Sequence, residues 1–305
     1  MDAAIEARGL VRHFGSVPAV DGIDLYVPRG SVYGFLGPNG SGKTTTIRLL
    51  VGLLRPDRGS ISLLGGSPHE ASCLAQVGVI VERPAFYPYL SAHENLRLFA
   101  TLARMPSAAG SAAADRALGA VGLSTVSRRK VGGFSTGMKQ RLAMALALLR
   151  DPTLVILDEP TNGLDPGGVV EVRGLIGELA RSGRTVFLST HVLTEVEQLC
   201  DRVAVLQRGR LVAEGLTKEL LERGRQLAIT FDTREEAVGA ARVLAEAGLV
   251  SEPAEDGEST LLVTADRLGS SAVSRLLAGQ GLYPAELVVR RASLESVFLQ
   301  LTDGV

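Results

Sequence analysis

The stretch Gly37-Pro38-Asn39-Gly40-Ser41-Gly42-Lys43-Thr44 is the most informative part of this chain because of what lies on either side of it. An apolar run from Ser31 to Leu36 precedes it, and from Thr45 to Leu54 apolar residues recur at helical spacing. A glycine-rich turn that only caps a helix would not need a lysine and a threonine at its end. The pattern therefore predicts a phosphate-binding loop between a buried strand and a helix.

The residue types in this loop suit a nucleotide. Glycines let successive backbone N–H groups turn toward phosphates, and the N-terminus of the following helix adds partial positive charge. We expect Lys43 to reach the β- and γ-phosphates and the Thr44 hydroxyl to bind Mg²⁺.

Composition sets the limits for the rest of the chain. Its 305 residues suggest about two domains. With a formal net charge of −1, the chain lacks the excess of basic residues that is typical of a nucleic-acid-binding protein. Cys73 and Cys200 are the only cysteines, which argues against a disulfide scaffold or a zinc site and favours a reducing cytoplasm. We see no signal-peptide pattern and no apolar stretch of the roughly 18 residues that span a bilayer. Any passage through a membrane is expected to come from another chain.

Hydrophobic periodicity predicts an α/β fold for residues 1–216. The strands near the loop are expected to join its helix in one α/β layer, and crossover helices between the later strands imply a mostly parallel sheet. Only helices are expected in an insert at about 84–150, which opens with the capping-box sequence Ser91-Ala92-His93-Glu94. The strands are expected at residues 3–11, 23–27, 61–64, 77–81, 153–157, 185–188 and 203–206, with a helix from 166 to just before 183.

Residues 226–305 are predicted to form a small α+β domain, separated from the core by the charged stretch 217–225. This domain holds 12 acidic and 6 basic residues, and a net charge of −6 argues against phosphate-rich partners. Strands are expected at 226–231, 260–263 and 287–289, and helices at 235–247, 270–277 and 294–301.

Two acids end the apolar run Leu154 to Leu157. In open α/β sheets, ligands bind at the carboxyl ends of the strands. Asp158 is therefore expected to hold Mg²⁺ through its water shell, and Glu159 to orient the attacking water or accept its proton. The alternative is a strand end with two solvated acids before the turn at Pro160.

The order of these motifs resembles that of the ATP-binding subunits of ABC transporters over residues 1 to about 216. Phe134-Ser135-Thr136-Gly137-Met138 resembles the family signature, Leu-Ser-Gly-Gly-Gln, although Thr136 and Met138 depart from it. Asn162-Gly163-Leu164-Asp165 resembles the family's D-loop, and Thr190-His191 resembles its switch histidine. The fold implied is a P-loop NTPase core with a mostly parallel sheet and a helical insert, followed by the small α+β domain.

The resemblance implies an ATP sandwiched between two copies of the chain, because the family signature faces the γ-phosphate bound to the second subunit. It also implies that His191 contacts the γ-phosphate and links it to Glu159. Without the resemblance, a lone phenylalanine such as Phe14 is more often a core residue, and a histidine at a strand end is more often on the surface. The nucleotide-binding residues implied are Phe14 against adenine, Gly37, Pro38, Asn39, Gly40, Ser41, Gly42, Lys43, Thr44 and Thr45 around the phosphates, and Ser135, Gly137 and Asp165 from the second copy.

Glu82 stands where most members of the family have the Q-loop glutamine. A carboxylate there adds negative charge near Mg²⁺ and the attacking water, so we count Glu82 among both the catalytic and the metal-binding candidates. With Pro84 to Leu90, it resembles the branch of exporters that confer bacitracin resistance and lantibiotic immunity. The segment Ser293 to Thr302 resembles the tail of drug-export ATPases of the ABC-2 type.

The function implied is that of an ATP-hydrolysing subunit of an exporter. A homodimer would bind ATP and Mg²⁺ at the cytoplasmic face of the cell membrane and drive a separate integral-membrane permease, which docks near Phe86 to Leu90. The exported compound would be a drug, an antibiotic or a peptide, and no nucleic acid is expected as a partner. A soluble ABC-type ATPase acting on ribosomes or DNA is the alternative, although such relatives usually carry two cores or long coiled coils. A nucleotide-binding regulator without turnover conflicts with the pair Asp158 and Glu159.

Overall fold

The computed structural model divides the chain into two compact units, Met1–Gly215 and Leu216–Val305, and each is treated by itself below. The residues that the structure describes are 3–81, 85–223, 226–254, 257–264 and 270–290.

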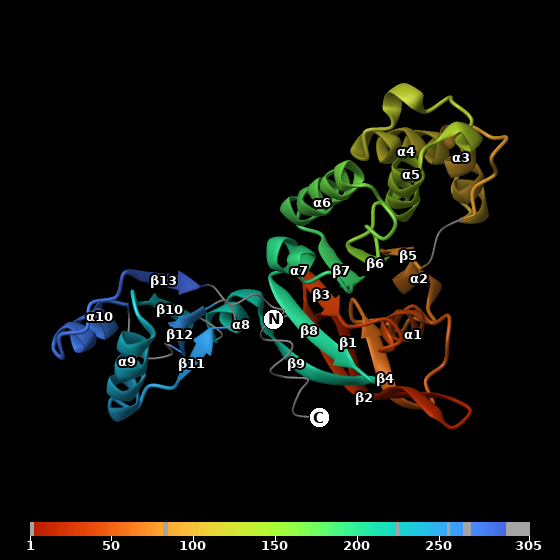
Figure 1. Ribbon diagram of the computed structural model, residues 1–305. Coiled ribbons are helices and arrows are strands. Elements are labelled where there is room, and N and C mark those ends of the chain that lie inside the picture. Colours follow the sequence, from red (N-terminus) through yellow and green to blue (C-terminus); the bar gives the residue numbers. More distant parts are fainter. Residues whose placement is uncertain (1–2, 82–84, 224–225, 255–256, 265–269, 291–305) are drawn as a thin grey trace. The chain divides into compact units, whose positions relative to one another are not determined.

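A six-stranded sheet forms the centre of the first unit (Figure 1). Its strand order is β5-β6-β7-β3-β8-β9, and the pairs from β5 through to β8 are parallel. Three of its strands are buried at every residue, as expected for parallel strands that are covered on both faces. This arrangement confirms the predicted α/β fold with a mostly parallel sheet. The strands are β3 (Val32–Leu36), β5 (Val77–Ile80), β6 (Leu154–Asp158), β7 (Thr185–Thr190), β8 (Arg202–Gln207) and β9 (Arg210–Leu216).

Helices cover both faces of this sheet. Tyr33 and Phe35 belong to a core that they share with the apolar residues of α1, whereas a Cβ atom at Gly34 would touch Val196 and Cys200 at α7 on the opposite face. The helix α1 begins and ends earlier than the predicted Thr45 to Leu54, because Gly52 takes a left-handed φ of 73° just after it. The helices are α1 (Lys43–Leu50), α2 (Ala71–Leu74), α6 (Pro166–Arg181) and α7 (Leu193–Leu199).

Three strands form a separate antiparallel sheet, in the order β2-β1-β4, rather than joining the α/β layer as predicted. The reason is local: β1 runs directly into β2 through a hairpin in which Phe14 pairs with Val17, and a turn this short allows only antiparallel pairing. Ala19 of β2 lies next to the phosphate loop, since its carbonyl oxygen would be 2.3 Å from a Cβ atom at Gly42. The strands are β1 (Ala3–Phe14), β2 (Val17–Pro28) and β4 (Arg58–Leu63).

Residues 92–148 form three helices, α3 (Ala92–Leu102), α4 (Ser107–Ala120) and α5 (Thr136–Leu148), with short 3₁₀ turns at Ser124–Val126 and Val131–Gly133. The predicted capping box is confirmed: Glu94 N donates to Ser91 Oγ at 3.2 Å, and Ser91 N donates to Glu94 Oε2 at 2.8 Å. The hydrogen bond from the Ser91 backbone lowers the pKa of Glu94. This cap fixes the start of α3.

The second unit has its own sheet, in the order β11-β12-β10-β13, with antiparallel pairing throughout. Its βαββαβ sequence of elements and this strand order are those of the ferredoxin-like motif. The charged stretch expected to separate the domains contains the helix α8, and the helix predicted at 294–301 lies outside the described residues. The elements are α8 (Thr217–Arg223), β10 (Gln226–Thr230), α9 (Arg234–Glu246), β11 (Ser251–Ala254), β12 (Gly257–Thr264), α10 (Ser270–Ala278) and β13 (Glu286–Arg290).

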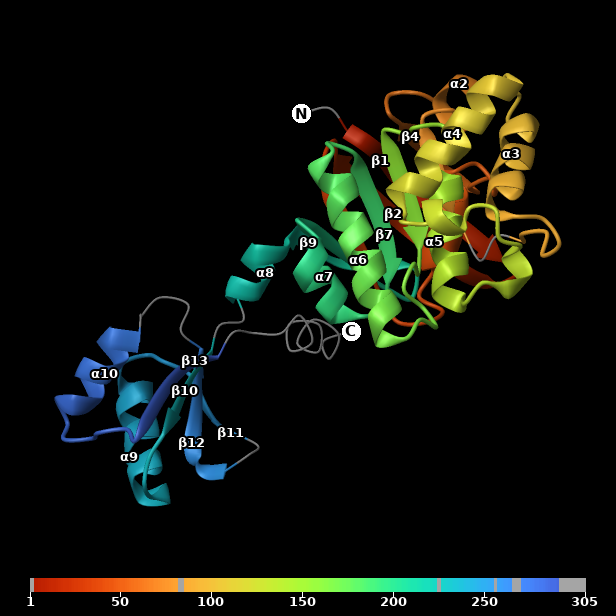
Figure 2. The same ribbon diagram turned by 90° about the horizontal axis from the view of Figure 1, so that it is seen from above.

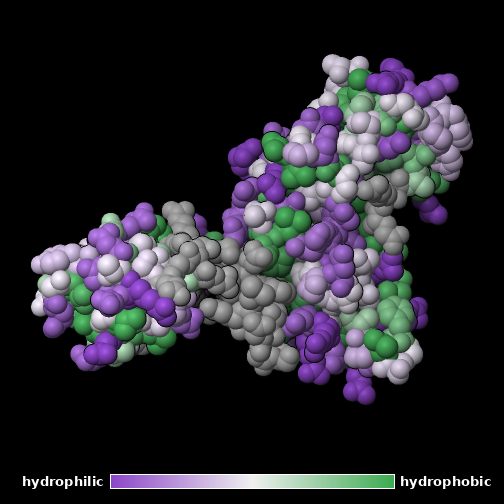
Figure 3. Space-filling model, in the orientation of Figure 1, coloured by the Kyte–Doolittle hydropathy of each residue, from purple (hydrophilic) through white to green (hydrophobic). Residues whose placement is uncertain are grey.

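Among the described residues, none of the helices has the length and apolar character needed to cross a membrane. On the face shown in Figure 3, hydrophilic residues are interspersed with smaller hydrophobic patches.

Candidate functional site

The phosphate loop connects β3 to α1, and its glycines are required by close backbone contacts. A Cβ atom at Gly37 would lie 2.4 Å from the carbonyl oxygen of Leu206, and one at Gly42 would lie 2.3 Å from that of Ala19. Gly42 is also the N-cap of α1, with φ of 109° and no side chain to cap the helix. The first backbone amides of α1 therefore face the loop as donors suited to an anion.

Lys43 is buried and is held over this loop. Its Nζ donates to the carbonyl oxygens of Gly37 at 2.7 Å and Pro38 at 3.2 Å. The same nitrogen lies 3.1 Å from Oε1 of Glu159. Two carbonyl groups thus fix the ammonium group in place, and the carboxylate of Glu159 is the partner that a phosphate would replace.

A pocket of about 260 Å³ opens beside Lys43. Ser41, in the same loop, has a buried hydroxyl oxygen with no hydrogen-bond partner in the described part of the chain, which is rare for a buried polar atom and marks a group ready to bind a ligand. With the lysine and the helix N-terminus, this donor set fits the phosphates of a nucleotide. The lining residues are Ala19, Asn39, Gly40, Gly42, Lys43, Thr44, Thr45, Glu159 and Asn162.

Glu159 follows β6 in a strained backbone conformation. Its φ is 48°, in the left-handed region that is uncommon for residues other than glycine. Its N–H donates to both the carbonyl oxygen and the Oγ of Ser189, at 3.2 and 3.1 Å. Its Oε2 lies 2.6 Å from Nδ1 of His191. The backbone bonds hold the strained turn, so that the carboxylate lies between Lys43 and His191.

Asp158 is buried and accepts a hydrogen bond of 2.5 Å from Ser189 Oγ. Within the described part of the chain, no group of three or more His, Cys, Asp or Glu side chains is suited to hold a metal ion. One carboxylate, one hydroxyl from Thr44 and substrate phosphates are nevertheless a donor set that Mg²⁺ accepts, because this ion keeps several of its waters. The residues present therefore fit Mg²⁺ bound together with a nucleotide.

Phe14 lies at the end of β1 and is half exposed, so the alternative of a core phenylalanine is wrong. The guanidinium carbon of Arg12 lies 5.3 Å from the centre of its ring, a cation–π arrangement. Asp57 accepts hydrogen bonds from Arg12 Nη1 at 2.9 Å and from the backbone N–H of His13 at 2.7 Å. The bond from His13 is the main cause of a lowered pKa at Asp57. These contacts leave an aromatic side chain available to a ligand.

A second pocket, of about 580 Å³, lies between the N-termini of α5 and α6. Ser135 caps α5 by accepting from Met138 N at 3.2 Å, and Asp165 caps α6 by accepting from Gly168 N at 2.8 Å. A Cβ atom at Gly137 would meet nothing within 4 Å. The two pockets share none of their described lining residues, so the predicted site residues that line a pocket fall into two groups on one chain. Asn39, Gly40, Gly42, Lys43, Thr44, Thr45 and Glu159 line the first, and Ser135, Gly137 and Asp165 line the second.

Glu82 lies outside the described residues. Sequence reasoning missed Ala19 and Ser189. Ala19 offers no signal, because its backbone carbonyl makes the approach to Gly42. Ser189 did offer a signal, because it lies at the carboxyl end of a parallel strand, where it pairs in register with Asp158 of the neighbouring strand. A serine at that position could have been recognised as a partner of the two acids.

Known proteins are similar to this chain in sequence and in fold. A family model described as ABC transporter matches residues 20–162. The chain is 38% identical to the bacitracin transport ATP-binding protein BcrA of Bacillus licheniformis, over 100% of this chain and 99% of that protein. It is also 38% identical to the daunorubicin resistance ATP-binding protein DrrA3 of Streptomyces coeruleorubidus, over 99% of this chain and 96% of that protein.

A solved structure described as the ATP-binding subunit of an ABC transporter superposes with a TM-score of 0.63 at 31% identity, covering 71% of this chain and 91% of that one. Full-length similarity in sequence thus accompanies the same core fold. The chain belongs to the ABC transporter family, as a subunit that binds and hydrolyses ATP.

Proposed function

We propose that two copies of this chain bind ATP and Mg²⁺ at two composite sites and power a separate membrane permease that exports a drug, an antibiotic or a peptide. The observation that carries the proposal is the division of the site residues between two pockets without a shared lining residue. Each pocket would supply some of the hydrogen-bond donors for a phosphate, and neither pocket contains all of these donors. A twofold dimer would bring the first pocket of one copy opposite the second pocket of the other.

The first pocket would bind the nucleotide. Lys43, the Ser41 hydroxyl and the first amides of α1 would hold the phosphates, while Phe14 would stack on the base. Thr44 and Asp158 would hold Mg²⁺, which when bound offsets the charge that develops on the phosphates. The second pocket would add Ser135, Gly137 and Asp165 from the other copy.

Glu159 would act on the attacking water, by orienting it or by accepting its proton. In the structure its carboxylate is shared between Lys43 at 3.1 Å and His191 at 2.6 Å. Lys43 would exchange this carboxylate for a phosphate oxygen, which leaves Glu159 oriented by His191 alone. Glu82, outside the described residues, stays among the catalytic and metal-binding candidates.

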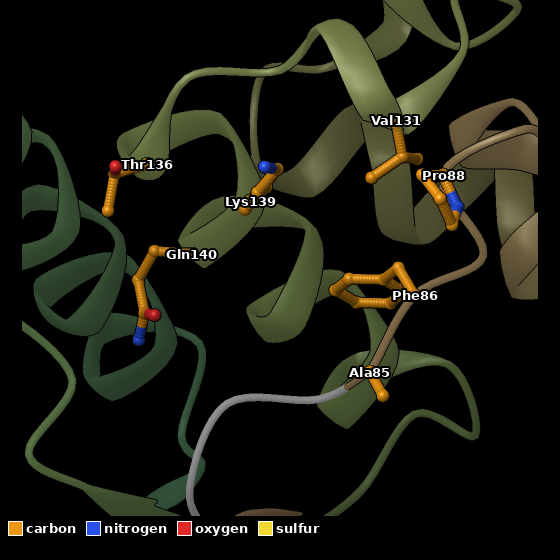
Figure 4. A pocket seen from close by; sticks show the side chains of 7 residues that line it. All are labelled: Ala85, Phe86, Pro88, Val131, Thr136, Lys139 and Gln140. Carbon is orange, nitrogen blue, oxygen red and sulfur yellow. The ribbon is translucent and has the colours of Figure 1, made fainter.

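The permease would dock beside the segment Phe86 to Leu90. Tyr89 is 64% exposed, and tyrosine is one of the aromatic residues enriched at protein interfaces. The same segment contributes Phe86 and Pro88 to a pocket of about 360 Å³, which Lys139 also lines. Figure 4 shows these side chains. Docking here would place the subunit at the cytoplasmic face of the cell membrane.

Export is favoured by the relatives, whose names refer to bacitracin transport and daunorubicin resistance. We assign residues 1–216 to the ATPase domain and 226–305 to a module that regulates or stabilises the dimer. Deletion beyond residue 220 tests the second assignment. Unchanged dimerisation and unchanged transport in the truncated protein would contradict it.

The function is tested by trapping the dimer with Glu159→Gln and ATP in its native cells and identifying the proteins that co-purify in mild detergent. A protein with several membrane spans, recovered in near-equal amount, is expected. Glu178→Gln, the same substitution at an exposed position of α6, is the matched control and should recover much less of it. Ribosomal proteins or DNA-bound factors instead would favour the alternative of an ATPase that acts away from membranes.

A further inference from the structure

A buried carboxylate close to the catalytic residues has no role in the proposal above. Glu195, in the first turn of α7, is 2% exposed. Burying a charge is costly unless the group is paired and hydrogen-bonded. Both of its oxygens have partners: Oε2 accepts a hydrogen bond of 2.8 Å from Thr190 Oγ1, and Oε1 lies 3.9 Å from Nη2 of Arg173. The side chain of Glu195 is therefore held in one position by partners at both oxygens.

The first partner, Thr190, directly precedes His191. Its hydroxyl oxygen also accepts a hydrogen bond of 3.0 Å from the backbone N–H of Val192, so the hydroxyl bridges the turn on both sides of His191. A hydroxyl has one hydrogen and two acceptor lone pairs. A carboxylate can only accept hydrogen bonds. The hydroxyl hydrogen of Thr190 therefore points to Glu195, and its lone pairs are left to accept from the N–H of Val192.

His191 depends on this turn for its direction. Its side chain is 40% exposed, and its Nδ1 lies 2.6 Å from Oε2 of Glu159. The contact with Glu159 therefore depends on where the backbone of this turn places the ring. The backbone is held on the other side as well, because the carbonyl oxygen of Thr190 accepts from the N–H of Gly37 in the phosphate loop at 3.3 Å.

The second partner, Arg173, joins this turn to α6. Its Nη1 donates to Gln198 of α7 at 2.8 Å, while its Nη2 approaches Glu195. The helices α6 and α7 lie side by side in both ribbon views (Figures 1 and 2). The turn is thus tied to the helix that Asp165 caps.

We propose that Glu195 is a positioning residue for ATP hydrolysis, which acts through Thr190 to hold the turn that aims His191 at Glu159. The inference rests on the roles proposed above for His191 and Glu159. It assigns Glu195 no contact with the nucleotide. We call the two hydrogen bonds of the Thr190 hydroxyl, with Glu195 and with Val192, the clamp. Loss of the clamp should therefore lower kcat and leave the binding of ATP unchanged.

Two matched pairs of variants test the clamp in the full-length protein. Thr190→Val removes the hydroxyl at nearly constant volume, whereas Thr190→Ser keeps it. Glu195→Ala removes the acceptor, whereas Glu195→Gln keeps an oxygen that can accept from Thr190. A small displacement of a catalytic group can cost about 100-fold in rate. We expect Thr190→Val and Glu195→Ala to lower kcat by about 10- to 100-fold, with KM and the Kd for ATP within about twofold of wild type, and we expect the two conservative variants to retain most of the turnover.

The double variant of Thr190→Val and His191→Ala separates positioning from a general loss of stability. If the clamp acts through His191, the double variant is no slower than His191→Ala alone. Wild-type kcat in Thr190→Val, together with impaired His191→Ala, would overturn the clamp and leave the proposed function intact. Wild-type kcat in His191→Ala would instead remove the proposed role of His191. If Glu195→Ala does not fold, the Thr190 pair decides the outcome.

Discussion

The two pockets of the first unit differ in how their side chains are used. Around Lys43, the functional groups bind one another across β6, β7 and the phosphate loop, as the contacts of Glu159 with Lys43 and His191 show. In the pocket of Ser135 and Asp165, each side chain instead caps its own helix, and the hollow is larger, about 580 against 260 Å³. A single chain can therefore organise the residues to which we assign catalysis. The other pocket presents two helix N-termini, which are suited to an anion that another molecule brings.

The largest effect is expected from Glu159→Gln, which removes the carboxylate at the centre of the first pocket. Turnover should fall by about 10²- to 10⁴-fold, because this is the usual contribution of a general base. ATP binding should persist, since Lys43 loses a competing partner. Steady-state ATPase assays and equilibrium binding on the same preparation measure both quantities. Normal turnover in the purified dimer would remove the assignment of Glu159, and Glu178→Gln should behave as wild type.

Gly137→Asp tests the second pocket by itself. Nothing lies within 4 Å of the new Cβ atom, and an acid in the first turn of α5 suits the helix dipole, so the fold should be retained. The new charge would oppose a facing phosphate and cost several kcal/mol, lowering turnover by at least about 100-fold at unchanged ATP binding. Gly137→Ala is the control and should remain active. Weakened ATP binding in the monomer would show that the two pockets are not separate.

Mixing two inactive variants sharpens this test. Lys43→Ala inactivates the first pocket and should weaken ATP binding by about 10- to 100-fold, because a charge-assisted contact is lost. Gly137→Asp inactivates the second pocket. In the heterodimer, one composite site has both changes and the other has neither. An equal mixture should recover about a quarter of wild-type turnover, since half of the dimers have one intact site of two. Absence of recovery, with heterodimers verified by mass spectrometry, would contradict sites shared between copies.

A smaller effect is expected at the edge of the first pocket. Phe14→Ala should raise the Kd for ATP by about 5- to 10-fold, which corresponds to the loss of one stacking contact. Phe14→Tyr keeps the ring and should bind as wild type. Isothermal titration with ATP measures the difference. Equal Kd values for the alanine and tyrosine variants would show that Phe14 does not contact the base.

The smallest effect is a pH dependence at Asp57, which supports the segment of Phe14. The hydrogen bond from His13 lowers the pKa of this carboxyl in the folded state. Its contribution to stability is therefore present above its ordinary pKa of about 4, and it is lost as the pH falls through the folded value. Asp57→Asn should lower Tm slightly at neutral pH, and the difference from wild type should shrink in acid. A difference that stays constant with pH would contradict this origin.

Sequence reasoning succeeded where the signal is local. The phosphate loop, the two acids at the end of β6 and the cap at Ser91 each depend on a few adjacent residues, and the structure places them as predicted. It predicted β1, β2 and β4 as strands but placed them in the wrong sheet. Period-two alternation shows that a strand forms and not which sheet it joins. It also missed Ser189 and Glu195, whose partners lie on other strands and helices.

The strand, the glycine-rich loop and the helix that begins with Lys43 and Thr44 could be predicted from the sequence, because steric freedom, helix periodicity and charge are properties of neighbouring residues. The contacts of Glu159 with Lys43 and His191, and the position of Ser135 and Asp165 in a different pocket, are visible only in the tertiary structure. Those relations depend on the order of strands in the sheet and on the packing of α5 and α6. Both arise from contacts between residues that are far apart along the chain.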